Sequence, residues 1–139
     1  SEILVDSIGL GAGVVDRLME LDLPARGINV AESSSIGQKY VRLRDELWFS
    51  GREWLEAKDC KLPKDETLIS ELAIARFSYT STGKLKVEGK DEMKKRGHKS
   101  PDVADAFLLT FAGNAVRASS GSKHRYNKPI QYPSTSWVV

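Results

Sequence analysis

The feature that most constrains the fold is a short apolar run that ends on an acid and is followed by a glycine-rich turn. The run ILV at residues 3–5 predicts a buried strand, Asp6 closes it, and the turn SIGLGAG follows directly. Residues 14–23 carry apolar side chains at helical spacing, and residues 28–31 predict a second strand. The order strand, helix, strand predicts a parallel α/β unit at the start of the chain.

The rest of the sequence predicts further helices, one hairpin and a tail. A change in composition marks the tail, in which Ser, Gly, Lys, Asn and Pro dominate. The predicted elements are an amphipathic helix over residues 38–57, a helix capped by Asp65, a hairpin with strands over 77–80 and 84–88, a last helix over 100–117, and a flexible tail over 118–139.

Length and composition are those of one domain, because 139 residues with 40% apolar side chains can bury a single core. The formal net charge of +2 only weakly favours a polyanionic partner. The single cysteine, Cys60, excludes an internal disulfide and an all-cysteine metal site. No apolar run in the sequence approaches the roughly 20 residues that cross a bilayer. We therefore expect a cytosolic protein with no membrane partner.

Asp6 is the first candidate for chemistry. Parallel sheets bind ligands at the carboxyl ends of their strands, and a carboxylate placed there can hold Mg²⁺ or Mn²⁺. The alternative is that Asp6 only caps the following turn. Glu32, which closes the second predicted strand, is a weaker supporting acid at the same edge.

The glycines after Asp6 do not match a nucleotide-binding motif. Gly9, Gly11 and Gly13 give G-x-G-x-G, which is neither the dinucleotide fingerprint nor a phosphate-binding loop ending in G-K-[ST]. We predict instead that these glycines let the backbone turn sharply and pack close to the strand.

A second pair of acids opens the last predicted helix. Ser100 suits the N-cap and Pro101 the first helical position, which places Asp102 in the first turn. Asp105 follows three residues later on the same helix face. Two carboxylates on one face are a candidate metal site, although acids in a first turn also simply stabilise helices.

A basic stretch immediately precedes these acids. Cations beside a metal site are typical of proteins that act on phosphodiesters, but a charge run is also often just a solvated surface. The candidate DNA-binding residues are Lys90, Lys94, Lys95, Arg96, His98 and Lys99.

Three segments resemble the nuclease domain of tailed-phage terminase large subunits. VDSIGLGAGVVDRL (residues 5–18) resembles the second acidic motif of that family, and KVEGKDEMKKRGHKSPDVADAFLLTFA (86–112) resembles the end of the domain. KYVRLRDELW (39–48) resembles the intervening helix. The order of the segments also matches, so the resemblance spans most of residues 1–115.

The resemblance implies an RNase H-like fold, in which helices flank a mixed sheet. It implies that Asp6, Asp102 and Asp105 are catalytic acids that bind two Mg²⁺ or Mn²⁺ ions, and that the metals cleave DNA by activating water and stabilising the leaving oxygen. Asp6 matches the family's second acid, Asp102 the last essential acid, and Asp105 a further acid of the same motif.

The sequence departs from the family at its start, because nothing before Asp6 matches the family's first acid. We therefore expect residues 1–117 to be the C-terminal part of such a domain, without its first strands. The natural polypeptide is expected to extend upstream. An incomplete sheet leaves an exposed edge, so we also expect self-association.

The resemblance also implies partners and a place of action. These are double-stranded DNA, the capsid portal and the small terminase subunit, in the cytoplasm of a bacterial host of a phage or prophage. A non-catalytic component that binds DNA or the portal through the basic stretch and the tail is the alternative, and it would tolerate asparagine at Asp6 and Asp102. A third interpretation is another RNase H-like nuclease, such as a resolvase or transposase.

Overall fold

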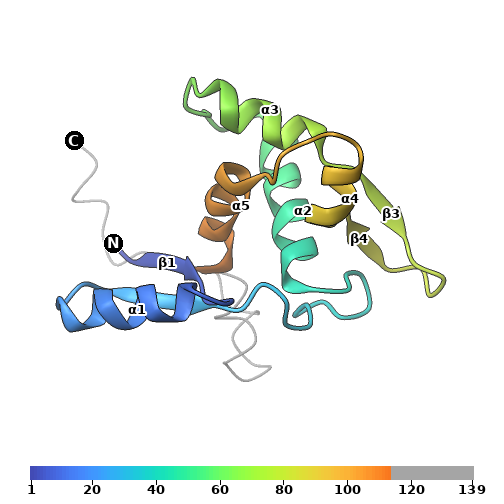
Figure 1. Ribbon diagram of the computed structural model, residues 1–139. Helices are drawn as coiled ribbons and strands as arrows, with labels where there is room; N and C mark the ends of the chain where they lie inside the picture. The colour runs from blue at the N-terminus through green and yellow to red at the C-terminus, as the bar shows by residue number, and fades with distance from the viewer. Residues whose placement is uncertain (114–139) are drawn as a thin grey trace, which may run out of the picture.

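The computed structural model describes residues 1–113. The end of the helix predicted to reach residue 117 and the tail predicted over 118–139 lie outside this part of the chain. The elements shown in Figure 1 are β1 (Ile3–Asp6), α1 (Gly11–Glu20), β2 (Ala25–Ile28), α2 (Leu43–Glu56), α3 (Glu66–Ile74), β3 (Phe77–Tyr79), β4 (Leu85–Val87), α4 (Lys90–Lys95), α5 (Asp102–Leu108) and the 3₁₀ turn η1 (Leu109–Phe111). The chain is thus of the α/β class, as predicted.

The N-terminal unit is the predicted parallel strand–helix–strand arrangement. β1 and β2 pair in parallel, with Asp6 opposite Ile28. β2 begins three residues earlier than predicted, and Gly27 lies inside it rather than ahead of it. A Cβ atom on Gly27 would lie 3.1 Å from the Cβ atom of Ser7 and 3.5 Å from a methyl carbon of Val15 on α1. Glycine at this strand position therefore allows the close packing.

The turn after β1 depends on glycine in two ways. Gly9 has a φ of +64°, a conformation that glycine adopts without strain. Gly11 begins α1 so close to β1 that a Cβ atom there would lie 1.7 Å from the backbone oxygen of Asp6. The predicted role is confirmed for Gly9 in the turn and for Gly11 in close packing, whereas a Cβ atom at Gly13 would meet nothing within 4 Å.

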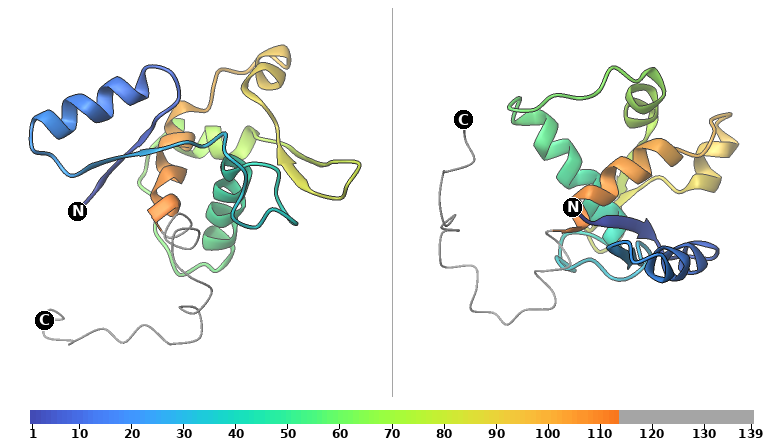
Figure 2. Two further views of the ribbon diagram at one scale, coloured as in Figure 1. Left: turned by 90° about the horizontal axis from the view of Figure 1, so that it is seen from below. Right: turned by 90° about the vertical axis from the view of Figure 1, so that its left-hand side faces the viewer.

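The core lies where α2 and α5 cross. Leu47 of α2 and Leu108 of α5 are almost fully buried, together with Ala104, and Leu68 of α3 joins the same cluster. Gly51 allows this crossing, because a Cβ atom there would lie only 2.2 Å from a methyl carbon of Leu108. Figures 1 and 2 show α5 between the β1–α1–β2 unit and the β3–β4 hairpin.

The single mixed sheet expected from the sequence is not seen in residues 1–113. β3 and β4 form the predicted antiparallel hairpin, but β1–β2 and β3–β4 are two separate two-stranded sheets. The helices α2 and α5 occupy the space between the two sheets (Figure 1). The hairpin is extended only by one parallel bridge between Tyr40 and Leu85.

The start of α2 is tied to this hairpin by one buried acid. Asp45 is 3% exposed, and its carboxylate accepts hydrogen bonds from the backbone N–H of Arg42 at 2.9 Å and of Val87 at 2.8 Å. The loop before Arg42 is held by a second buried acid, Glu46, which accepts from the hydroxyl of Ser34 at 2.6 Å. These contacts explain why the helix predicted from residue 38 begins at Leu43.

Replacing Asp45 with alanine is expected to destabilise the fold, because two backbone donors lose their acceptor. An orphaned buried donor costs about 1–3 kcal/mol, so the free energy of unfolding should fall by at least that amount. Urea unfolding followed by circular dichroism measures the change. Asp16→Ala on the exposed surface of α1 is the matched control and should change stability by no more than about 0.5 kcal/mol. If Asp45→Ala and Asp16→Ala had the same free energy of unfolding, the hydrogen bonds of Asp45 would not contribute to stability.

Candidate functional site

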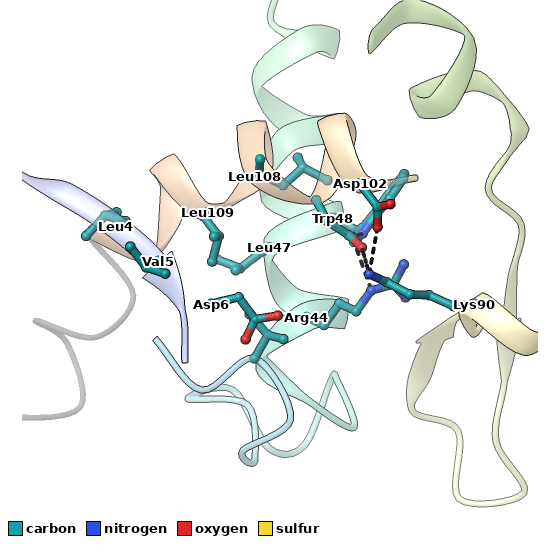
Figure 3. A pocket seen from close by; sticks show the side chains of 13 residues that line it. Leu4, Val5, Asp6, Arg44, Leu47, Trp48, Lys90, Asp102, Leu108 and Leu109 are labelled. Carbon is teal, nitrogen blue, oxygen red and sulfur yellow. Dashed lines mark hydrogen bonds and ion pairs between the residues drawn. The ribbon is translucent and has the colours of Figure 1, made fainter. Parts of the chain in front are cut away.

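The three predicted acids line one pocket with a volume of about 370 Å³. Asp6 comes from the end of β1, and Asp102 and Asp105 come from the first turn of α5. Figure 3 shows Asp6 on one side of this pocket and Asp102 with Lys90 on the other. Arg44 of α2 lies between the two sides. We call this pocket the acidic pocket.

Asp6 caps the following turn, which is one of the two roles that the sequence left open, and it also lines the acidic pocket. Its Oδ1 atom accepts a hydrogen bond from the backbone N–H of Ile8 at 3.2 Å, so it caps the turn. It is also half-buried and faces the acidic pocket (Figure 3). Its position at the carboxyl end of a parallel strand follows directly from the β1–β2 pairing.

Asp102 and Asp105 share a single cation. The Nζ atom of Lys90 lies 3.0 Å from Oδ1 of Asp102 and 3.5 Å from Oδ2 of Asp105. Burial acts to lower the pKa of Lys90, but its hydrogen bond to Asp102 and the attraction of both carboxylates outweigh burial, so the pKa is raised. Lys90 is therefore a fixed positive charge in the pocket at neutral pH.

Asp105 is held more firmly than Asp102. Its Oδ1 atom accepts hydrogen bonds from Nε1 of Trp48 at 2.9 Å and from Nε of Arg44 at 3.2 Å. Its side chain is 22% exposed, whereas that of Asp102 is 73% exposed. Trp48 is 8% exposed and belongs to the core. Asp105 is thus fixed by the core, and Asp102 is open to solvent.

Arg44 is the site residue that sequence reasoning missed. It pairs with Asp105, donates from Nη1 to the backbone oxygen of Glu88 at 3.1 Å, and stacks on the Trp48 ring at 5.4 Å. It therefore joins α2, α5 and the loop that leads into α4. Arg44 lies within the segment KYVRLRDELW, but nothing in that local pattern marks which of its arginines faces the pocket.

The donor chemistry of the acidic pocket suits a hard cation. Three carboxylates against the two cations Arg44 and Lys90 leave one net negative charge. The ammonium group of Lys90 already shows that Asp102 and Asp105 can hold positive charge between them. Within residues 1–113, however, no three acidic, histidine or cysteine side chains are close enough to form a complete metal-ligand set.

The start of α5 differs slightly from the prediction. Pro101, not Ser100, occupies the N-cap position, and no side chain caps this helix. Pro101 is fully buried, and its backbone oxygen accepts from the N–H of Asp105 at 2.8 Å. The burial of the proline ring fixes the start of the helix, with Asp102 as the first helical residue.

The basic stretch does not form one surface. Arg96 forms an ion pair with Glu88 and donates to the backbone oxygen of Ile74 at 2.8 Å, so its charge holds the fold together. The hydrogen bond from Arg96 is the main cause that lowers the pKa of Glu88. Of the other residues in the stretch, Lys90 lines the acidic pocket and His98 is half-buried. The remaining ones are exposed, namely Lys94, Lys95 and Lys99.

Glu32 does not join the three acids. Its side chain is exposed, and it is not among the residues that line the acidic pocket. Its backbone oxygen accepts from the N–H of Leu43 at 2.9 Å, which fixes the loop ahead of α2. β2 ends at Ile28, earlier than predicted, so Glu32 lies in that loop and not at the strand end.

Comparison with known proteins supports the resemblance seen in the sequence. No protein-family model matches the chain, and no curated protein matches it. Among solved structures, the nuclease domain of the large terminase subunit gp2 of bacterial virus Sf6 superposes with a TM-score of 0.62 at 24% identity, covering 76% of this chain and 62% of that chain. Its K428A mutant with manganese gives a TM-score of 0.63 at 23% identity, covering 76% and 63%. The mutant with calcium gives 0.62 at 23% identity, covering 76% and 62%.

The fold of this chain is therefore similar to that of a terminase nuclease domain. The particular domain that it resembles here is that of the Sf6 large terminase subunit, and the likeness is one of fold. The chain spans less than two thirds of the length of the domain that it matches. No helix in residues 1–113 is both long and apolar enough to span a membrane.

Proposed function

We propose that this chain is a segment of a terminase large-subunit nuclease, a metal-dependent endonuclease that cuts concatemeric viral DNA during genome packaging. The observation that carries the proposal is that Asp6, Asp102 and Asp105 line one pocket in a fold like that of a terminase nuclease domain. Asp6 is far from Asp102 and Asp105 in the sequence, and the fold places all three around one pocket.

In this proposal the open carboxylates of Asp6 and Asp102 hold Mg²⁺ or Mn²⁺, whose preferred ligands are oxygens. Metals bound there would supply an activated water and charge stabilisation for the leaving oxygen of the phosphodiester. Lys90 stays protonated beside Asp102 and presents positive charge to the scissile phosphate. Arg44 and Trp48 hold Asp105, so that Lys90 and the start of α5 keep their relative positions.

The partners and place of action are part of the same proposal. They are double-stranded DNA, the portal and the small terminase subunit, in the cytoplasm of a bacterial host. Self-association belongs here too. Large apolar side chains are exposed over the β1–α1–β2 unit, namely Ile3, Ile8, Leu10, Val14, Met19, Leu21 and Leu23. A two-stranded parallel sheet with such exposed surface favours pairing with more protein.

The test is cleavage of supercoiled plasmid by the purified chain. We expect nicked and linear DNA with Mn²⁺ or Mg²⁺, and intact plasmid with EDTA. An Asp6→Asn variant should be inactive, because it removes a charged ligand and keeps the side-chain size. Asp16→Asn, on the exposed face of α1, is the matched control and should cut at the rate of the unmodified chain.

Two results contradict the proposal. Intact plasmid under every divalent metal, both with this chain and with a form extended upstream to include a first acid, favours the non-catalytic interpretation, in which the chain binds DNA or the portal without cutting. Equal cleavage rates for Asp6→Asn and the unmodified chain would show that DNA is not cut in the acidic pocket. Gel filtration coupled to light scattering tests self-association separately.

A further inference from the structure

A second pocket, with a volume of about 320 Å³, adjoins the acidic pocket. The two pockets share Asp6, Val30, Arg44 and Lys90 as lining residues, so they meet along a common wall. We call the second pocket the flanking groove. Away from the shared wall its lining includes two more cations, Arg42 and Lys86.

Arg42 and Lys86 are both available to a ligand. Each is exposed, and neither forms an ion pair with another residue of 1–113. On β4, Lys86 lies between the buried residues Leu85 and Val87, so the alternation of the strand directs it away from the core. The cations on the shared wall, by contrast, are already paired with carboxylates.

The backbone segments that carry these two exposed cations are joined by the same buried carboxylate. Asp45 accepts from the backbone N–H of Arg42 and from that of Val87, the neighbour of Lys86. The backbone N–H of Val41 also donates to the oxygen of Leu85 at 3.3 Å. The residues that carry the charges therefore belong to one fixed framework.

The groove is more positive than the pocket it adjoins. Four cations line it, Arg42, Arg44, Lys86 and Lys90, against the two acids Asp6 and Asp45. The carboxylate of Asp45 is occupied by backbone donors. A groove that is lined by cations and adjoins an acidic centre suits a chain of phosphates whose one reacting member lies at that centre.

We propose that the flanking groove is the track of the DNA backbone on one side of the reacting phosphate, and that Arg42 and Lys86 bind its phosphates. This inference rests on the proposed nuclease function. It differs from the sequence-based prediction, because Lys94 and Lys95 line neither the groove nor the acidic pocket. Lys95 lines a different hollow, beside Arg76 and Phe77.

The test measures DNA binding without cleavage. A short fluorescein-labelled duplex is titrated with the full chain in EDTA over a range of salt concentrations, and fluorescence anisotropy gives the dissociation constant. The Arg42→Ala/Lys86→Ala double variant is compared with Lys94→Ala/Lys95→Ala, which removes the same number of charges. Thermal unfolding of each variant establishes that it is folded, and Arg42→Lys/Lys86→Arg tests whether charge alone restores binding.

In Arg42→Ala/Lys86→Ala, we expect the slope of log affinity against log salt to become shallower by about 0.9 for each phosphate that is no longer neutralised. The Lys94→Ala/Lys95→Ala variant should keep the original slope. The inference is overturned if both double variants flatten the slope equally, if only the Lys94/Lys95 pair matters, or if the unmodified chain binds no DNA. Weaker binding by the groove variant, with no plasmid cleavage either by the unmodified chain or by a form extended upstream to include a first acid, would support the groove and reject the nuclease function.

Discussion

Asp102→Asn is expected to abolish metal-dependent DNA cleavage while leaving the fold intact. Changes to the partners of metal ligands already cost about 10–100-fold in activity, so the loss of a ligand itself should cost at least about 100-fold. The Asp102 side chain is 73% exposed, and within residues 1–113 it forms an ion pair with the half-exposed Lys90 alone. The free energy of unfolding should therefore change by no more than about 0.5 kcal/mol. Plasmid cleavage and urea unfolding measure the two quantities.

Asp105→Asn is the matched comparison, because it makes the same chemical change three residues further along α5. Here we expect a loss of stability as well, since Arg44 loses its ionic partner at a site where both side chains are mostly buried. Hydrogen bonds to charged groups contribute about 1.5–3 kcal/mol, and partial exposure places the expected loss at the lower end. If the Asp102→Asn variant lost more stability than the Asp105→Asn variant, then Asp102, and not Asp105, would be the acid that the fold holds in place.

Gly11→Ala is expected to have the second large effect, a loss of both stability and cleavage. The substitution displaces Asp6 without removing any functional group. The new methyl carbon would lie 1.7 Å from the backbone oxygen of Asp6, so β1 and α1 must move apart. Overpacking of this kind costs about 1–3 kcal/mol of stability. A displacement of about 1 Å at a reacting group costs roughly 100-fold in rate, so cleavage should fall by a similar factor.

Gly13→Ala supplies the control for that experiment. It lies on the same helix, and a Cβ atom at Gly13 meets nothing within 4 Å. Replacing a helical glycine with alanine should stabilise the chain by about 0.5–1 kcal/mol and leave cleavage unchanged. Thermal unfolding and plasmid cleavage measure stability and rate for both variants. Equal stability and equal cleavage rates for Gly11→Ala and Gly13→Ala would show that the contact between Gly11 and Asp6 does not position the acid.

The parts of the site that were predictable from the sequence are those encoded by neighbours along the chain. The run ILVD followed by glycines specified a strand that ends on Asp6 and turns at once into a helix. The spacing of Asp102 and Asp105 placed both acids on one helix face, and Lys90 does contact both of them. Such features depend on backbone geometry within a few residues, which sequence patterns carry well.

Sequence patterns were a weaker guide where a charge had several potential partners. Arg96 was grouped with the DNA-binding cations, yet the fold pairs it with Glu88 and the backbone of α3. Conversely, Arg42 and Lys86 lie outside the basic stretch and line the flanking groove. The local pattern of charges cannot distinguish these cases, because a lysine or arginine side chain reaches whichever acid the tertiary structure brings near it.

By itself, then, the sequence determined the α/β class, the parallel N-terminal unit, the hairpin, and the two elements that carry the candidate acids. Only the tertiary structure decided that β1 and the start of α5 face one pocket, that Arg44 and Trp48 hold Asp105, and that the strands form two sheets. The physical reason is the range of the interactions. Strands, turns and helix faces follow from local backbone preferences, whereas the pocket follows from packing between segments that are distant in the chain.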